Sequence, residues 1–259
     1  MNAANLTVRT ITPAEHLDFI RSQRSASFLQ TPAWGEVKSD WRRESIGWYD
    51  GDGTLAGVAL VLYRQLPKVR RYLAYLPEGP VIDWSSQNLS DWLAPMTRHL
   101  GEQGAFGVRM GPPVVTRRWT ADAVKKGVAD PEVGRLSDVP PAERSQVGAR
   151  VVSQLRELGW RLQAVEGGFA AGQPQYNFQI PLTGRTEDEV LKGMNQLWRR
   201  NIKKATKAGV EVSRATTEDL DERLREFHEL YVHTAERDHF TPRPLSYFQT
   251  MFRALLAEE

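Results

Sequence analysis

The residues from 194 to 207 combine an apolar helical face with a strongly basic one. The apolar face repeats at helical spacing and consists of Met194, Trp198, Ile202 and Ala205. The basic face consists of Arg199, Arg200, Lys203, Lys204 and Lys207. Like charges four residues apart on a helix repel each other by roughly a few tenths of a kcal/mol. A bound polyanion would offset that repulsion, so the pattern favours RNA phosphates or anionic lipid headgroups as partners. A solvated basic helix face explains it equally well.

A second group of chemically capable residues surrounds Arg243. Thr241 and Tyr247 flank Pro244, which is expected at the first position of a helix. A helix N-terminus gathers unpaired N–H groups and partial positive charge, so an adjacent guanidinium and a tyrosine hydroxyl would suit a phosphate. The alternative is a capped surface helix in which Arg243 pairs with a nearby carboxylate.

Trp34, Lys38 and Trp41 form the third group. Thr31 and Pro32 predict a helix start, because threonine caps free N–H groups and proline suits the first helical position. In that helix, the spacing i, i+4 and i+7 places a cation between two aromatic planes, which suits a nucleotide or a phosphorylated sugar. The alternative is a pair of core tryptophans beside a lysine whose ammonium reaches solvent.

Several catalytic motifs are missing from the 259 residues. There is no Gly-x-x-x-x-Gly-Lys loop, His-Glu-x-x-His helix or Gly-x-Ser-x-Gly elbow, which removes the best evidence for nucleotide hydrolysis, zinc proteolysis and serine esterase chemistry. The sequence has no cysteine, and His228 and His233 do not share a helix face. We therefore predict neither a metal site nor a cofactor.

The composition is typical of a globular protein with no strong overall field. Apolar residues make up 41% of the chain and charged residues 25%, with a formal charge of +2. No positive segment followed by an apolar one marks a secretory signal. The longest apolar stretch, 55–63, is shorter than the ~20 residues that cross a bilayer. We expect a cytoplasmic protein of about two domains.

The elements that must position these residues follow from periodicity and turn signals. The expected strands of the first part cover 6–10, 43–49, 55–64, 72–76, 106–110 and 160–165. The expected helices start at Pro13 and Pro32 or cover 89–102 and 151–158. This order predicts a compact α/β domain with a mixed sheet.

We place a domain change within 166–175, a stretch rich in glycine, alanine and glutamine that lacks periodicity. The expected domains are 1–172 and 173–259. After the change, one long strand and three helices are expected, too few strands for a sheet of their own. We therefore expect the second domain to be incomplete in this chain.

The second part begins with the alternating residues 176–182, which predict a strand. Thr186 and Glu189 then form a capping-box pair, and the helix that they open is expected to cover 186–208 and stop at Gly209. The remaining expected elements are a short strand at 210–213 and helices that begin near 217 and at Pro244.

Four separate stretches match the pattern of one protein family. They are Phe28-Leu29-Gln30 with Trp34, Lys38 and Trp41; Tyr75 with Gly79-Pro80-Val81; Arg199 to Ala205 with Gly209-Val210; and Thr234 to Arg237 with Arg243-Pro244 and Tyr247-Phe248. In this order the chain resembles the FemABX peptidyltransferases, including FemX-like enzymes, which make the cross-bridges of peptidoglycan. The joint match is far more specific than any single stretch.

The resemblance implies tandem domains similar to the GNAT (acyl-CoA N-acyltransferase) fold, with the second incomplete here. It implies transfer of an amino acid from aminoacyl-tRNA to the stem peptide of a peptidoglycan precursor, either lipid II or UDP-MurNAc-pentapeptide. Peripheral contact with the inner face of the plasma membrane is also implied. Which amino acid and which precursor are used stays open.

The resemblance also implies site residues. Lys38 and Arg243 would contact the pyrophosphate of the precursor, and Trp41, Thr241 and Tyr247 would line the same pocket. The tRNA acceptor arm, or else the membrane surface, would contact Arg199, Arg200, Lys203 and Lys204. The family's phenylalanine–lysine segment has no counterpart here, so we expect catalytic residues beyond Glu259 and little or no reaction by this chain alone.

The expected reaction is attack of the stem-peptide amine on the aminoacyl ester, through an oxyanion that needs a positive or N–H donor. The ester is already activated, so orientation and charge stabilisation suffice, and we assign no catalytic base. One alternative is an acetyl-CoA-dependent N-acetyltransferase, which would want an Arg/Gln-x-x-Gly-x-Gly/Ala loop that we do not find. The other is a non-catalytic binder of RNA or anionic lipid.

Overall fold

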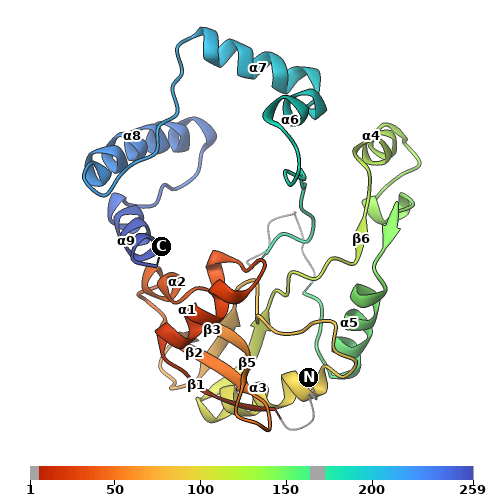
Figure 1. Cartoon of the computed structure of the whole chain (residues 1–259), viewed down its shortest axis with the longest axis vertical. Helices are drawn as coiled ribbons and strands as arrows, with labels where there is room; N and C mark the ends of the chain where they lie inside the picture. Colours follow the sequence, from red (N-terminus) through yellow and green to blue (C-terminus); the bar gives the residue numbers. More distant parts are fainter. Residues whose placement is uncertain (1–5, 164–172, 259) are drawn as a thin grey trace. The chain divides into compact units, whose positions relative to one another are not determined.

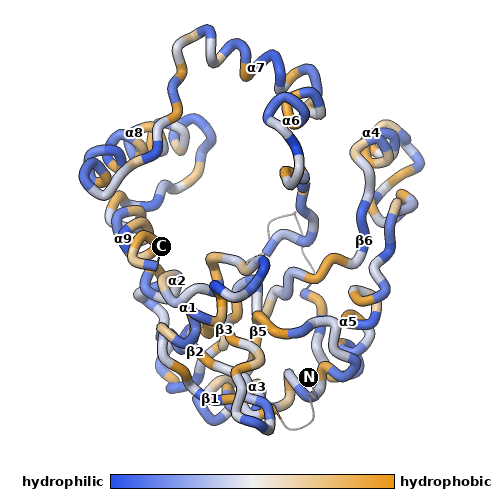
Figure 2. The backbone as a smooth tube through the Cα atoms, in the orientation of Figure 1, coloured by the Kyte–Doolittle hydropathy of each residue, from blue (hydrophilic) through white to orange (hydrophobic). Residues whose placement is uncertain are grey.

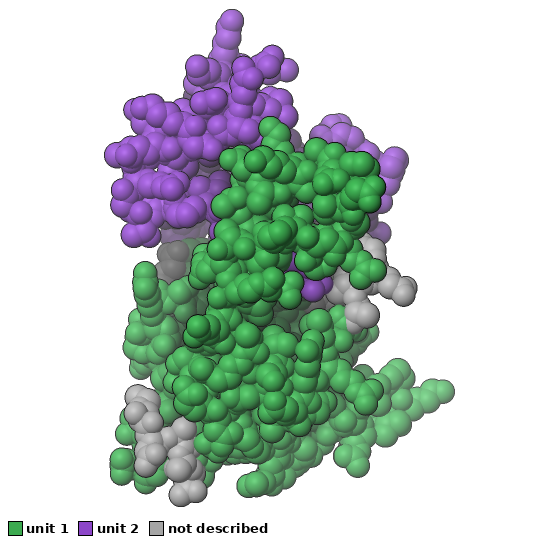
Figure 3. Space-filling view, turned by 90° about the vertical axis from the view of Figure 1, so that its right-hand side faces the viewer, with its two compact units in different colours: residues 1–173, 250–259 green, residues 174–249 purple. Residues whose placement is uncertain are grey.

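The computed structural model describes residues 6–163 and 173–258. Residue contacts group the chain into two compact units (Figure 3). Unit 1 comprises 1–173 with 250–259, and unit 2 comprises 174–249. The sheet lies in unit 1, whereas the described elements of unit 2 are helices.

Unit 1 is built on a five-stranded mixed sheet with the strand order β1-β2-β3-β4-β5 (Figure 1). The strands are β1 (Thr7–Thr10), β2 (Arg42–Tyr49), β3 (Leu55–Gln65), β4 (Tyr72–Leu76) and β5 (Ala105–Met110). Neighbours are antiparallel except β4 and β5, which run parallel. A helix crosses over between those two, as a parallel pair requires. The predicted α/β class with a mixed sheet is confirmed.

Helices pack on this sheet from both sides. Those that contact its strands are α1 (Pro13–Ser22), α2 (Pro32–Val37) and α3 (Ser90–Glu102). Unit 1 also contains α4 (Ala121–Ala129) and α5 (Gln146–Glu157). Single 3₁₀ turns occur at Phe28–Gln30 and Leu136–Asp138, and a small ribbon pairs β6 (Arg117–Arg118) with β7 (Glu143–Arg144). The predicted helix 151–158 starts earlier, because the Ser145 hydroxyl caps α5 by accepting from the Gly148 N–H.

Two separate apolar clusters fix the sheet. The larger one joins Trp48 and other residues of one face to α3 through Trp92 and Met96, and the smaller one joins Val58 to α1 on the other side. Because both faces are covered, the residues from Val58 to Tyr63 are all buried and do not alternate. Figure 2 shows this hydrophobic run along β3.

Unit 2 contains α6 (Glu187–Gly193), α7 (Gln196–Lys207) and α8 (Leu220–Asp238), and α9 (Leu245–Leu256) starts in it. Aromatic rings connect α8 with α9. Phe227 and Tyr231 of α8 lie 5.1 and 5.2 Å from the Phe248 ring of α9, centroid to centroid. This cluster is the apolar centre of the helical pair.

Several predicted elements of the later chain were wrong. The single helix 186–208 is two helices, because Asn195 caps a new start by accepting from the Trp198 N–H. The strands predicted at 176–182 and 210–213 are not formed, since no described strand pairs with them. Residues 160–163 are irregular as well, and the rest of the strand predicted at 160–165 lies outside the described residues.

Candidate functional site

Two cations and two aromatic rings form a line across β3, β4 and β5. The Arg64 guanidinium lies 5.7 Å from the Trp41 ring centroid, Trp41 lies 6.3 Å from Tyr75, and the Arg109 guanidinium lies 5.8 Å from Tyr75. Arg109 sits opposite Tyr75 in the parallel register of β4 and β5. We call these four residues the cation–aromatic row.

The row lies on the sheet face opposite the larger apolar cluster. Tyr75 is partly exposed, whereas its neighbours Ala74 and Leu76 are fully buried in that cluster. The Tyr75 hydroxyl donates to the Gln173 side-chain oxygen at 2.8 Å. Burial raises the pKa of Tyr75, so the phenol stays a neutral donor.

Gln30 connects the segment before α2 to the end of β4. Its side chain is fully buried and donates through Nε2 to the Pro77 carbonyl at 2.6 Å, while its Oε1 accepts from the Leu60 N–H at 3.1 Å. A Cβ atom at Gly79 would clash with this amide, which explains why glycine occupies that position. The contact between two of the stretches that carry the family resemblance is therefore direct.

Lys38 and Trp41 do not share a helix face, so that prediction was wrong. α2 ends at Val37, and a turn follows in which the Trp41 N–H donates to the Lys38 carbonyl. The Lys38 ammonium instead lies 4.7 Å from the ring of buried Trp34. Trp41 lies past the turn, where its cationic neighbour is Arg64. The predicted Thr31 cap is also absent, because that hydroxyl donates to the Phe28 carbonyl.

Two side chains of α8 form hydrogen bonds with the backbone of the segment from Thr241 to Tyr247. The His228 Nε2 donates to the Arg243 carbonyl at 2.9 Å, and the Arg243 N–H donates to the Tyr231 hydroxyl at 3.4 Å. The Arg243 guanidinium lies 4.5 Å from the Tyr247 ring centroid and has no ion pair among the described residues. Burial raises the pKa of Tyr247. Thr241 is exposed.

The helix in this segment starts one residue later than predicted. Leu245 is the first residue of α9, and Pro244 precedes it with its carbonyl accepting from the Tyr247 N–H at 3.0 Å. The structure thus brings Arg243 and Tyr247 together in unit 2, and it places Lys38 and Trp41 in unit 1. Convergence of Lys38 and Arg243 on one diphosphate stays a prediction.

The basic face of α7 is open to solvent. Arg200, Lys203 and Lys204 are exposed, Arg199 is partly exposed, and none of them forms an ion pair among the residues that the structure describes. The opposite face is open as well, since Trp198 is 62% exposed. Among the described residues, therefore, neither the basic nor the apolar face of α7 is buried against another element.

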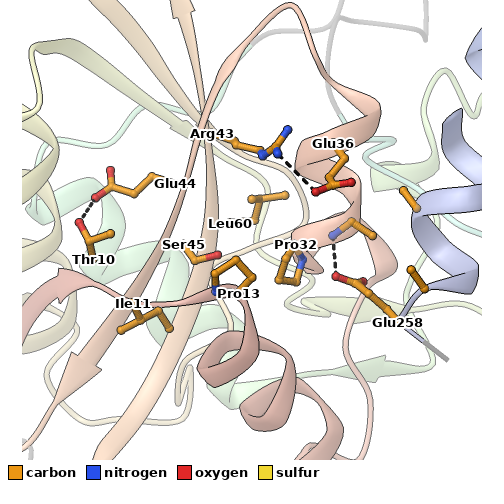
Figure 4. Close-up of a pocket in the computed structure, with 13 residues that line it drawn as sticks. Thr10, Ile11, Pro13, Pro32, Glu36, Arg43, Glu44, Ser45, Leu60 and Glu258 are labelled. Carbon is orange, nitrogen blue, oxygen red and sulfur yellow. Dashed lines mark hydrogen bonds and ion pairs between the residues drawn. The ribbon is translucent and has the colours of Figure 1, made fainter.

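A pocket of about 360 Å³ with a mixed polar and apolar lining lies between β1, β2, α1, α2 and the end of α9 (Figure 4). At one side, Glu44 accepts hydrogen bonds from Thr10, from Tyr63 and from His99 at 2.8 Å. Burial is the largest single influence on the pKa of Glu44 and raises it, but the three hydrogen bonds together lower it. At the other side, Glu258 accepts from the Ala33 N–H at 2.7 Å.

Sequence reasoning missed most of these partners. Arg64, Arg109 and Gln173 belong to no motif, and only strand register places the first two beside Trp41 and Tyr75. Among the described residues no cluster of histidine, aspartate or glutamate could hold a metal ion. In the same part of the chain, none of the helices has the length and apolar character needed to cross a membrane.

Comparison with known proteins identifies the family. A model of the FemAB family matches residues 11–255. The chain belongs to the FemAB family. The FemAB match includes the whole cation–aromatic row as well as the segment from Thr241 to Tyr247, so both groups lie within the part that defines the family.

Individual FemAB-type relatives agree with this assignment. The lipid II:glycine glycyltransferases of Staphylococcus aureus strains MRSA252 and NCTC 8325 / PS 47 are each 27% identical over 252 residues, which is 95% of this chain and 51% of each relative. A crystal structure of FemX superimposes with a TM-score of 0.68 at 25% identity and covers 95% of this chain and 54% of that one. The chain thus spans about half the length of the relatives it matches.

Proposed function

We propose that this chain belongs to an aminoacyltransferase that moves an amino acid from aminoacyl-tRNA to the stem peptide of a peptidoglycan precursor. The observation that carries the proposal is the FemAB match over residues 11–255. The Staphylococcus aureus relatives are named for glycyl transfer involving lipid II, which supports a precursor of this class. Because the chain spans half of each relative, we assign the activity to the complete gene product.

The proposed architecture is a GNAT-like first domain followed by the first part of a second one, with the change near residue 173. Unit 2 supports this, because the segments 176–182 and 210–213, which were predicted to be strands, expose apolar side chains that strands normally bury. Phe178 is 96% exposed, Val212 is 97% exposed, and the apolar face of α7 is uncovered. Such surfaces are expected of residues that pack against further strands.

Hydrogen exchange tests this architecture. Backbone amides of 176–182 and 210–213 should exchange rapidly in this chain and become protected in the complete gene product, because strand pairing would bond them there. Amides of β3 serve as the matched control, since they are already paired in this chain and should be equally protected in both. Equal, rapid exchange of the two segments in both proteins would contradict the proposal.

In the proposed site, Lys38 and Arg243 bind the diphosphate of the precursor, and Trp41, Thr241 and Tyr247 line the pocket. The geometry around Arg243 supports this role, since its backbone is fixed by His228 while its guanidinium has no carboxylate partner in the described chain. An arginine in that state can form a bidentate pair with a phosphate.

The proposed reaction needs no covalent enzyme intermediate. The acceptor amine attacks the ester carbonyl carbon of aminoacyl-tRNA, the C–N bond forms, and the tRNA 3′ oxygen leaves and takes up a proton. The protein aligns the two substrates and stabilises the oxyanion. The α7 cations would contact the acceptor arm of the tRNA, and peripheral contact with the inner membrane face would bring a lipid-linked precursor within reach.

A transfer assay on the complete gene product tests the function. Radiolabelled amino acids from a pool of charged tRNAs are expected to appear on lipid II or on UDP-MurNAc-pentapeptide. Lys38→Ala and Arg243→Ala should each weaken precursor binding about tenfold or more, because one charge-assisted contact contributes roughly 1.5 to 3 kcal/mol. Lys125→Ala and Arg225→Ala, at exposed positions of the same residue types, are the matched controls.

Two outcomes would overturn the proposal in different ways. Transfer from acetyl-CoA and not from charged tRNA would assign the chain to the N-acetyltransferases. RNA or lipid binding that is unchanged in Lys38→Ala and Arg243→Ala, combined with no transfer, would leave only a binding function for the basic helix.

A further inference from the structure

We propose that the turn between β3 and β4 binds the surface of a membrane that contains anionic phospholipids. We call residues 66–71 the basic turn; they are Leu66, Pro67, Lys68, Val69, Arg70 and Arg71. The inference rests on the proposed function, because a lipid-linked precursor is met at such a surface. It assigns the peripheral membrane contact to particular residues, separate from those proposed for the precursor and for the tRNA.

The charge of the basic turn calls for an anionic partner. Its three cations, Lys68, Arg70 and Arg71, are exposed, and the turn contains no carboxylate. None of the three forms an ion pair with a described residue. The adjoining turn after α3 contributes one acid, Glu102, and Arg42, which donates to the backbone carbonyl of the next residue at 2.9 Å, balances it. The local surface is therefore positive and suits anionic headgroups.

Apolar side chains lie among these cations. Leu66 is 40% exposed and Val69 is 51% exposed. Phe106, which is 54% exposed, belongs to the start of β5, and this start pairs with the start of β4 directly after the turn. The same combination of apolar and basic side chains lets amphipathic helices lie among lipid headgroups. An RNA partner would favour rings on which bases stack, and the basic turn itself has none.

The backbone of the turn places Lys68 where the fold alone would favour glycine. The Val69 N–H donates to the Leu66 carbonyl at 3.4 Å, so Pro67 and Lys68 are the central residues of a four-residue turn. The φ of Lys68 is 65°, in the left-handed region. A lysine costs stability there that a glycine would not, so its side chain is better explained by a contact than by the fold.

The basic turn is also remote from the other end of β4. The turn leads into Tyr72, the first residue of the strand, whereas Tyr75 and Leu76 lie at its end. β4 has five residues, so its two ends are ~13 Å apart at the usual rise of a strand. A membrane that contacts the turn therefore does not cover the carboxyl end of β4.

Flotation of the chain with lipid vesicles tests the proposal. Vesicles of phosphatidylcholine mixed with phosphatidylglycerol should bind the chain, pure phosphatidylcholine vesicles should not, and added salt should weaken the binding. Each cation at such a surface contributes about fivefold in affinity, which corresponds to about 1 kcal/mol. Arg70→Gln combined with Arg71→Gln should therefore weaken binding at least about tenfold. The matched control is Arg117→Gln with Arg118→Gln, an adjacent exposed pair on β6, which should change affinity less than about twofold.

Substitution of Lys68 separates the charge from the fold. Lys68→Gly and Lys68→Gln both remove the charge, so each should weaken vesicle binding about fivefold. Glycine also accommodates the positive φ, so in urea unfolding Lys68→Gly should be at least as stable as the wild type. Weaker binding by that variant cannot come from lost folding. Val69→Ser should weaken vesicle binding as well, and it should leave the affinity for a short RNA hairpin unchanged.

Three outcomes would overturn the proposal. The first is equal vesicle affinity of the wild type and the variant that carries Arg70→Gln and Arg71→Gln. The second is vesicle binding that is lost in Lys203→Gln with Lys204→Gln and kept in the turn variant, which would move the contact to α7. The third is tighter binding of the RNA hairpin than of anionic vesicles through Arg70 and Arg71, which would assign the turn to RNA.

These results are distinguishable from failure of the proposed function. A complete gene product with Arg70→Gln and Arg71→Gln that binds anionic vesicles like the wild type, and transfers at the wild-type rate, would reject the turn and keep the function. Vesicle binding that depends on the turn, without any transfer, would reject the function and keep the turn.

Discussion

Replacement of Gln30 by methionine tests whether one buried amide joins two parts of the site. Methionine has nearly the same length and volume, so the substitution removes the hydrogen bonds and leaves the packing largely intact. Two good bonds are lost, the one to the Pro77 carbonyl at 2.6 Å and the one from the Leu60 N–H at 3.1 Å. The third, at 3.5 Å to the Leu60 carbonyl, is too long to count.

The expected loss follows from the groups that are left behind. Gln30 is fully buried, so the Leu60 N–H and the Pro77 carbonyl would have no partner and no access to water. Each unsatisfied buried group costs about 1 to 3 kcal/mol, which gives a total of roughly 2 to 6 kcal/mol. That is a large share of the ~5 to 15 kcal/mol that separates the folded and unfolded states of a typical domain.

Urea unfolding followed by tryptophan fluorescence measures this loss in unit 1 alone. Every tryptophan except Trp198 lies in unit 1, so a Trp198→Phe background removes the signal of unit 2. Gln65→Met is the matched control, because Gln65 is exposed and its change should cost less than about 0.5 kcal/mol. A loss below 1 kcal/mol for Gln30→Met would refute the reasoning.

A double-mutant cycle adds a second check on the same contact. Gly79→Ala alone should be strongly destabilising, because the added Cβ meets the Gln30 amide. In a Gln30→Ala background the amide is gone, so the same change should cost at least about 1 kcal/mol less. Equal costs in the two backgrounds would show that Gly79 is required for another reason.

Two further predictions concern pH. Burial lowers the pKa of His16 from 6.5 to about 4, so the unfolded chain binds a proton that the folded chain does not, and stability should fall by up to about 3 kcal/mol as the pH drops from 6.5 to 4. Unfolding free energies of His16→Asn should be flatter over that window; an unchanged slope would contradict the assignment. Tyr63→Phe removes a hydrogen bond to Glu44, which should cost about 1.5 to 3 kcal/mol at pH 7. Because the pKa of Glu44 is lowered in the folded state, this difference should shrink as the pH falls below 4.5, and a constant difference would contradict it.

The sheet of unit 1 was largely predictable because its signals are local. Glycines of the segment 50–53 mark the hairpin between β2 and β3, and Gly53 indeed has a positive φ of 78°. Thr12 and Glu15 form the capping box of α1, where the expected helix begins. Such signals depend on a few neighbouring residues, so tertiary contacts did not have to be known.

The errors in unit 2 have a different physical origin. Alternation from Tyr176 to Leu182 shows that a strand would have two unlike faces, but a strand also needs a neighbour for its N–H and C=O groups. None is present in the described chain, so the segment is irregular. The break before α7 was missed because Asn195 acts as a cap only once the chain departs from helical geometry there.

The cation–aromatic row was beyond sequence reasoning because its members are far apart in the chain. Arg64 and Arg109 come together through the registers of three strands, and a shift of one residue would send both side chains to the other face. For Trp41, helical periodicity suggested Lys38 as partner. The early end of α2 made Arg64 the partner instead.

Gln30 sets the positions of Lys38 and the row together. α2 has six residues and is ~9 Å long, so fixing its start largely fixes Lys38 at its end. The same amide holds Pro77, two residues after Tyr75 of the row. Loss of the amide would therefore move the two parts of the site relative to each other before unit 1 unfolds. Ligand affinity that falls in Gln30→Met at urea concentrations where the chain is still fully folded would be the direct sign of this positioning, since lost stability alone leaves the affinity of the folded fraction unchanged.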